Sequence, residues 1–298
     1  MAAYAGLAFL SLLWGSSFLL IKIASRAFDP FGFALARVGV AAAAMLLTSA
    51  LSGKVWPGSR PGLWMKLLAL ALTAQVVPFI LLGQAAKLTT SADMALMMGA
   101  QPIFVFLFGR FLGSRDRWIP RAALGLAIGF AGVGAAFWSP GAGGGAHAVA
   151  GRALALAAAI SYGTGAIISG GATREIGAVR AVTASMTLST LGLGLAGVAF
   201  GKLPPPVALF QTAPGPMLAM VALGVFNTAL AYYVYFRLVN EEGPTFASLN
   251  NYIAPVIGVI AGAAALADPI APSAWTGLAL VLVGVALTGP SLRPAKAA

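Results

Sequence analysis

The chain has 298 residues, of which 60% are hydrophobic and only 8% charged, and its formal net charge is +11. A soluble protein of this length needs far more charge on its surface, so the composition indicates an integral membrane protein. The absence of cysteine excludes disulfides, thiolate metal ligands and cysteine nucleophiles.

Ten apolar runs are long enough to cross the roughly 30 Å hydrocarbon core of a bilayer. In chain order they cover residues 4–24, 31–51, 62–84, 91–112, 119–138, 150–172, 179–200, 215–237, 244–267 and 272–290. The first run has no basic stretch before it and no small-residue cleavage region after it, so we expect a span and not a removable signal peptide. We therefore predict an all-α integral membrane protein with ten transmembrane helices.

Most of the 18 basic residues fall on one side of the membrane if the N-terminus is cytoplasmic. The outer side then holds Lys22, Arg26, Lys87, Arg152 and Lys202. The positive-inside rule places both termini in the cytoplasm, and we expect the plasma (inner) membrane as the location. The basic residues occur in small groups and not as a long stripe, which argues against nucleic acid as a partner.

Two tracts of the chain carry the same pattern. Pro102 and Pro255 are each followed thirteen residues later by a charged residue, Arg115 in the first tract and Asp268 in the second. Two glycines follow in each tract at similar spacing. A repeat of about 150 residues would contain five spans.

We predict two five-helix repeats, residues 1–145 and 146–298. Because five is odd, the second repeat enters the membrane in the opposite sense, which is the inverted-repeat arrangement of many transporters. The opposite charges of Arg115 and Asp268 agree with inversion, since the two residues would close their spans on opposite sides of the membrane. Chance similarity between Gly- and Ala-rich helices is the alternative interpretation.

Several motifs recur in a fixed order along the chain. They are WGSSF at Trp14–Phe18, Asp29-Pro30 followed by Arg37, and the two proline tracts. In these features the chain resembles the EamA-type ten-span branch of the drug/metabolite transporter superfamily, and within it most closely the YddG-type exporters of aromatic and other amino acids. The resemblance covers essentially the whole chain. It departs from the family pattern at Ser114-Arg115 and Ala267-Asp268, where Gly-Glu is common.

Polar side chains near the middle of a span are costly in lipid, so we expect them to face a cavity or another helix. Spans five and ten contribute nothing comparable, and the resemblance also implies that these two spans pack outside a central cavity. The predicted substrate-binding residues are Trp14, Ser17, Gln75, Phe79, Met98, Gln101, Tyr162, Asn227, Tyr232 and Asn251. Ordinary helix packing is the alternative role for each.

Arg37 is the one cation clearly inside an expected span, where it would cost about 2.5–3.5 kcal/mol at the bilayer centre without a partner. Asp93 opens the fourth span from the same side, so we predict an Arg37–Asp93 pair that forms part of an outer gate or braces the helices. Pro78, Pro102 and Pro255 interrupt backbone hydrogen bonding within their spans and are predicted to kink them or to act as hinges.

These features favour a transporter that exports small metabolites by alternating access. Methionine and aromatic side chains suit hydrophobic bodies, and amides and hydroxyls suit an ammonium and a carboxylate, so we expect amino acids, including aromatic and hydrophobic ones. Apart from Asp93, no expected span carries a carboxylate or histidine, which favours a facilitator or exchanger over proton antiport. Export of drugs or of other neutral or cationic metabolites is the alternative.

Other classes of protein have less support. An intramembrane enzyme would need a nucleophile with a base, paired carboxylates or a metal cluster, and the sequence indicates neither these nor a cofactor motif. A channel or a membrane scaffold remains an alternative. The small-residue faces Gly125-x3-Gly129 and Gly258-x3-Gly262 permit close helix contact, for which we expect internal packing in a monomer, with a dimer interface as the alternative.

Overall fold

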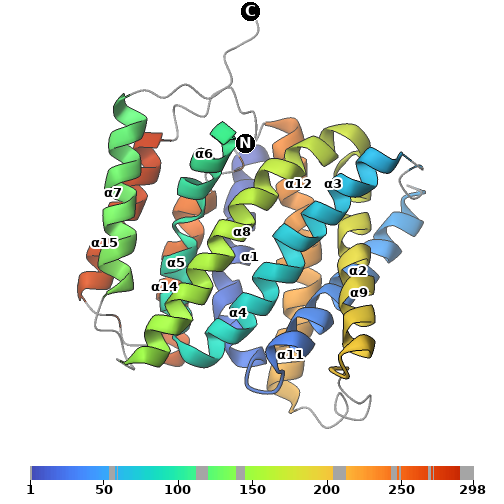
Figure 1. Cartoon of the computed structure of the whole chain (residues 1–298), viewed down its shortest axis with the longest axis horizontal. Helices are drawn as coiled ribbons and strands as arrows, with labels where there is room; N and C mark the ends of the chain where they lie inside the picture. Colours follow the sequence, from blue (N-terminus) through green and yellow to red (C-terminus); the bar gives the residue numbers. More distant parts are fainter. Residues whose placement is uncertain are drawn as a thin grey trace, which may run out of the picture.

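The computed structural model describes residues 2–53, 58, 60–111, 120–138, 145–203, 213–242, 247, 250–267, 270 and 272–288, and these contain helices, turns and no strand (Figure 1). In chain order the helices are α1 (Ala2–Ala24), α2 (Pro30–Leu51), α3 (Pro61–Ala71), η1 (Leu72–Val76), α4 (Val77–Leu88), α5 (Ser91–Met98), α6 (Gln101–Phe111), α7 (Pro120–Phe137), α8 (Ala146–Ile176), α9 (Ala178–Ala199), α11 (Pro214–Gly224), η2 (Val225–Leu230), α12 (Ala231–Glu241), α14 (Asn250–Leu266) and α15 (Pro272–Thr288).

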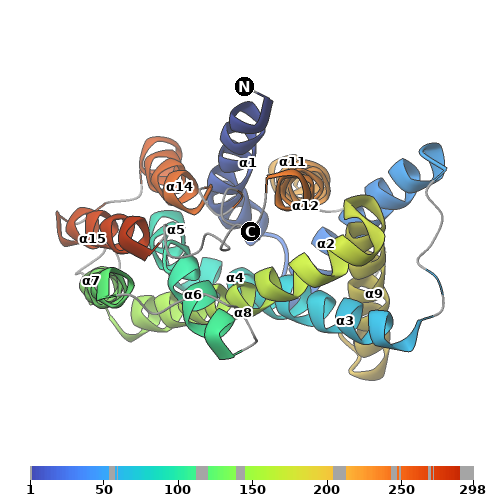
Figure 2. The ribbon, with the colours of Figure 1, turned by 90° about the horizontal axis from the view of Figure 1, so that it is seen from above.

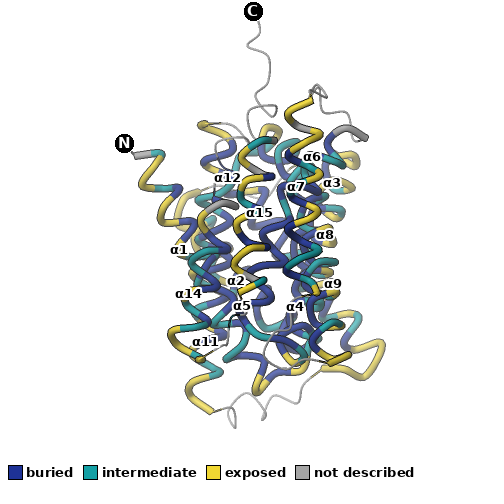
Figure 3. The backbone as a smooth tube through the Cα atoms, turned by 90° about the vertical axis from the view of Figure 1, so that its left-hand side faces the viewer, coloured by how far each residue is buried: buried dark blue, intermediate teal, exposed yellow. Residues whose placement is uncertain are grey.

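Each of the ten predicted spans coincides with one of these helices or with two or three consecutive ones. Seven described segments are long and apolar enough to cross a membrane, and three further apolar helices are shorter. Large apolar side chains such as Leu47, Leu195 and Leu218 point outward and are 62–72% exposed, on the outer surface that Figure 3 colours yellow. An outer surface of this kind needs lipid around it. The predicted fold class, an all-α multi-span membrane protein, is confirmed.

The helices form a bundle with two long sides (Figure 2). On one side lie α14, α1 and the α11–α12 pair, and on the other lie α6, α8, α4 and α3. At one end of the bundle α7 packs along α15, and at the other end α2 packs along α9. The fifth and tenth predicted spans therefore pair with each other at the edge of the molecule.

Small residues allow this close pairing at the edge. A Cβ atom added to Gly284 of α15 would lie 2.5 Å from the backbone nitrogen of Gly129, and one added to Gly258 of α14 would lie 2.6 Å from the Ala95 side chain. Both distances are too short for any side chain, so α15 approaches α7 backbone to backbone, and α14 packs directly on the small Ala95 side chain of α5. Both predicted small-residue faces thus make contacts inside the chain.

Two spans contain a π-helical segment at mid-length, η1 in the third span and η2 in the eighth. Pro78 follows η1 at the start of α4. Proline has no N–H to donate to the carbonyl four residues earlier, and its ring collides with that carbonyl in a regular α-helix, so the wider π turn accommodates it. Buried polar side chains, Gln75 in η1 and Asn227 and Thr228 in η2, lie in these two segments.

The other two predicted interruptions differ from each other. The fourth span breaks at Gly99 and Ala100, and Pro102 lies in the first turn of α6, where its missing N–H leaves no helical hydrogen bond unmade. Pro255, in contrast, lies inside the continuous helix α14. A matched pair of hinges stays a prediction.

The helices α1 and α8, which open the two predicted repeats, start at opposite ends of the bundle (Figure 1). Inverted repeats require their first helices to cross the membrane in opposite directions, and α1 and α8 do so. The inverted relation and the boundary between residues 145 and 146 stay predictions, and Arg115 and Asp268, whose charges suggested inversion, lie outside the described residues.

Candidate substrate cavity

A cavity lies in the middle of the bundle, between two clusters of packed apolar side chains. Its empty space, including the part open to solvent, is about 780 Å³. Six of the predicted substrate-binding residues line it: Trp14, Ser17, Met98, Gln101, Tyr162 and Tyr232. The described residues of α7 and α15 do not line it, as predicted for spans five and ten.

Aromatic rings from α1 and α12 form one wall of the cavity. The ring of Trp14 meets Tyr232 edge-on at a centroid distance of 5.8 Å and lies 5.1 Å from the ring of Tyr235. Phe236 continues this wall at 5.9 Å from Tyr232. Edge-on and tilted arrangements of this kind are favoured by the ring quadrupoles, so the wall is held in one geometry.

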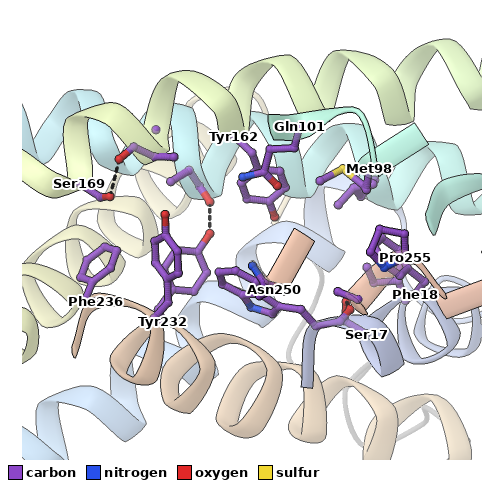
Figure 4. Close-up of a pocket in the computed structure, with 18 of the residues that line it drawn as sticks. Ser17, Phe18, Met98, Gln101, Tyr162, Ser169, Tyr232, Phe236, Asn250 and Pro255 are labelled. Carbon is purple, nitrogen blue, oxygen red and sulfur yellow. Dashed lines mark hydrogen bonds between the residues drawn. The ribbon is translucent and has the colours of Figure 1, made fainter. Parts of the chain in front are cut away.

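The break in the fourth span supplies part of the opposite side. Met98 ends α5 and Gln101 begins α6, and Figure 4 shows both side chains with Tyr162 across the cavity from Tyr232 and Ser17. The Ser17 hydroxyl donates to the Trp14 carbonyl at 2.6 Å, so its oxygen can still accept a hydrogen bond from a ligand. The side facing the aromatic wall is flexible and partly polar because it carries the Met98 thioether and the Gln101 amide.

The π segment η1 connects Pro78 to this site. The carbonyl that Pro78 cannot bond is that of Ala74, and the Tyr232 hydroxyl donates to it at 2.6 Å (Figure 4). The Tyr232 hydroxyl thus has an acceptor for its hydrogen, and the Tyr232 ring packs against Trp14 of α1. Pro78 thus shapes the cavity wall through the acceptor that it leaves free.

Arg37 of α2 lines the cavity and is 3% exposed. Its Nε donates to the Thr228 hydroxyl at 2.9 Å, and its guanidinium carbon lies 3.9 Å from the centroid of the Phe79 ring, a cation–π contact. Its Nη1 is buried and has no hydrogen-bond partner among the described residues. Arg37 therefore presents a positive charge to the cavity.

The predicted Arg37–Asp93 pair is wrong. Asp93 instead pairs with Arg152, whose Nε lies 3.2 Å from Oδ2 of Asp93, and it also accepts a hydrogen bond from the Thr89 hydroxyl at 2.6 Å. Nη1 of Arg152 donates to the Phe137 carbonyl. The sequence placed Arg152 outside the membrane, but α8 begins at Ala146, so Arg152 lies more than a turn inside the helix and is buried.

Three of the other predicted substrate-binding residues, Gln75, Phe79 and Asn227, do not line the cavity. Phe79 lies beneath Arg37, as described above. The Gln75 amide lies 3.2 Å from the Ser189 hydroxyl of α9. Asn227 donates to the Leu13 carbonyl and to the Ser16 hydroxyl of α1. These amides join helices, which is the packing role weighed for them, and the side chain of Asn251 lies outside the described residues.

Several lining residues were not among the predicted ones. Ser169 lies on the same face of α8 as Tyr162, seven residues later, with Gly165 and Ala166 between them, and this helical spacing is a signal that the sequence contains. Asn250 lines the cavity next to the predicted Asn251, and one residue along a helix turns the side chain by about 100°. The described residues contain no group of three or more metal-ligating side chains.

The fold and the cavity define a multi-pass membrane protein built around a central cavity, the class to which carriers belong. The chain belongs to the EamA-like transporter family, whose model matches residues 1–138 and again residues 149–289. It is therefore a membrane transporter of the drug/metabolite transporter superfamily.

Curated relatives are themselves named as transporters. The chain is 25% identical over 296 residues to the uncharacterized inner membrane transporter YedA of Escherichia coli strain K12, covering 96% of this chain and 91% of the relative. It is 26% identical over 198 residues to the uncharacterized transporter YvbV of Bacillus subtilis, covering 66% and 63%. A crystal structure that is 20% identical superposes with a TM-score of 0.68 and 96% coverage of both chains, which shows the same fold.

Proposed function

We propose that this transporter exports amino acids, including aromatic and hydrophobic ones, by alternating access, as a facilitator or exchanger. The observation that carries the proposal is the cavity itself. An aromatic wall that includes Trp14 and Tyr232 faces a flexible, partly polar side that includes Met98 and Gln101. Flat rings and an adaptable thioether suit an apolar side chain, while amides and hydroxyls suit the polar end of an amino acid.

Alternating access is supported by the way the helices pack. The cavity draws its lining from two separate apolar clusters, for example Phe18 and Met98 from one and Leu70 and Phe236 from the other. Two packed bodies can rock against each other while each keeps its own core. The two matches of the family model and the opposite directions of α1 and α8 favour inverted repeats, and each apolar cluster draws residues from both predicted repeats.

Location in the inner membrane with both termini in the cytoplasm is part of the proposal. The relative YedA is named as an inner membrane transporter, and the distribution of basic residues supports the orientation. Because the chain has no cysteine, single cysteines in the turns, such as Gly53→Cys and Gly201→Cys, can be labelled with an impermeant thiol reagent in cells. Labelling of Gly201→Cys from outside and of Gly53→Cys only after lysis would agree; the reverse pattern would contradict the orientation.

Counterflow in liposomes tests the transport function. Vesicles containing the purified full-length chain are loaded with unlabelled L-phenylalanine and diluted into tracer L-phenylalanine. We expect transient, saturable accumulation of tracer without an imposed pH gradient, since an exchanger needs only the trans substrate. Lack of counterflow for every amino acid in a panel would refute the proposed substrates. Non-saturating flux would favour a channel, and counterflow of cationic drugs alone would favour the alternative substrates.

A further inference from the structure

Arg37 presents an unusual combination of burial and incomplete pairing. Its side chain is almost entirely buried, yet its hydrogen-bonding partner is a neutral hydroxyl, that of Thr228, and its nearest ring is the apolar Phe79. A buried charge without a counter-charge is destabilising by several kcal/mol. The described residues give Arg37 no carboxylate partner, because Asp93 is taken by Arg152.

The unpaired atom of Arg37 belongs to the part of the side chain that recognises carboxylates. Nε is held by Thr228 and the plane of the guanidinium rests on Phe79, so the orientation of the group is fixed. Nη1 keeps its donors without a partner among the described residues, and Arg37 lines the cavity. A fixed guanidinium with free donors binds carboxylate oxygens with directed, charge-assisted hydrogen bonds.

The charge of the lining indicates which ligands fit. Among the described lining residues Arg37 is the only charged side chain, and none is acidic. In an amino acid the ammonium is attached to the carbon next to the carboxylate, so an ammonium would also lie close to the guanidinium without a negative side chain to offset it. A monocarboxylate without this ammonium would neutralise Arg37 without bringing a second positive charge into a region of low dielectric constant.

We propose that Arg37 is the carboxylate-binding residue of the cavity, and that the cavity binds organic monocarboxylates with an aromatic or aliphatic body even when they lack an α-ammonium group. The aromatic wall around Trp14 and Tyr232 would hold the body. Thr228 acts as a positioning residue, since it contacts Arg37 and does not line the cavity. The inference rests on the proposed function because it places the carboxylate in the cavity that the proposed function treats as the substrate site.

Binding to the purified full-length chain tests the proposal without requiring transport. The probe is tritiated 3-phenylpropionate, and the competitors are L-phenylalanine, L-phenylalaninamide and 2-phenylethylamine. We expect saturable binding that 3-phenylpropionate and phenylalanine compete for, while the amide and the amine compete at least tenfold more weakly. Equal competition by the amine or the amide, or no binding of the probe, would overturn the proposal.

Variants at Arg37 test the residue itself. We expect Arg37→Gln to weaken binding of 3-phenylpropionate by about 10- to 100-fold, the effect of losing a hydrogen-bonded charge, and to remove the preference for the acid over the amide. Arg37→Lys should weaken it less, because the charge remains. Lys66→Gln removes an exposed cation that pairs with Glu175 outside the cavity and serves as the matched control.

The outcomes separate this proposal from the proposed function. Unchanged affinity in a folded Arg37→Gln protein would overturn the carboxylate site, and if that variant does not fold, the competition panel on the unaltered chain still decides. Probe binding without amino-acid counterflow would leave the carboxylate site standing and remove the proposed function. Phenylalanine counterflow without probe binding would remove the carboxylate site and leave the proposed function standing.

Discussion

The buried ion pair between Asp93 and Arg152 predicts a large loss of stability when only one partner is removed. Their side chains are 9% and 3% exposed, and the pair connects α5 to α8 and, through the Phe137 carbonyl, to the end of α7. In Asp93→Asn the buried guanidinium of Arg152 loses the counter-charge of Asp93, which costs about 3–5 kcal/mol. At roughly 2–4 °C per kcal/mol, the apparent melting temperature should fall by about 6–20 °C.

The assay is thermal unfolding of the purified chain in detergent, with a double-mutant cycle. Asp93→Asn/Arg152→Met should be more stable than the sum of the single effects by about 1–3 kcal/mol, because it leaves no stranded charge. Lys66→Gln, which breaks an ion pair with side chains 50% and 32% exposed, should change stability by less than about 1 kcal/mol. If Asp93→Asn melts within a degree or two of Lys66→Gln, or if the two single effects simply add, the role assigned to the buried pair is wrong.

Three other substitutions test the packing and the cavity wall. Tyr232→Phe keeps the ring but removes the hydrogen bond to Ala74, so we expect a loss of about 0.5–1.5 kcal/mol in stability, and a larger loss would contradict the local role of that bond. Gly284→Val should sharply lower the yield of folded protein in size-exclusion chromatography because its Cβ would lie 2.5 Å from Gly129, whereas Gly134→Ala, with open space around it, should be neutral. Trp14→Ala removes part of the aromatic wall and should raise the concentration of phenylalanine needed for half-maximal counterflow at least tenfold without preventing folding; an unchanged value would contradict its contact with substrate.

The spans could be predicted from the sequence because lipid imposes a simple requirement, a long apolar run for each crossing. Trp14 and Tyr162 could be predicted as cavity residues for a related reason, since polar or amphipathic side chains at mid-span have to face inward. Depth alone does not give direction around the helix axis. The i→i+5 turn of η1 shifts the faces that Gln75 and Phe79 present, so these two residues contact neighbouring helices instead of the cavity.

The partner of a buried charge could not be predicted because it depends on which helices are neighbours. Asp93 and Arg37 start from the same side of the membrane, but α5 packs on α8 while α2 packs on α9. Arg152 lies near the start of the sixth predicted span and was therefore expected on the outer side, whereas the structure buries it inside the bundle. The sequence did show that Arg37 needs a partner, and the structure gives it the Thr228 hydroxyl and the Phe79 ring, with Nη1 unpaired among the described residues.

The most direct test of the central claim, that this cavity is the substrate site of a carrier, uses a single cysteine at Met98. The unaltered chain has no cysteine, and Met98 lines the cavity. The Met98→Cys protein therefore carries its single thiol in the cavity. We predict that Met98→Cys supports counterflow of phenylalanine, that alkylation abolishes it, and that phenylalanine slows the alkylation, while the unaltered chain is insensitive to the reagent. Full counterflow by completely alkylated Met98→Cys protein would contradict the account.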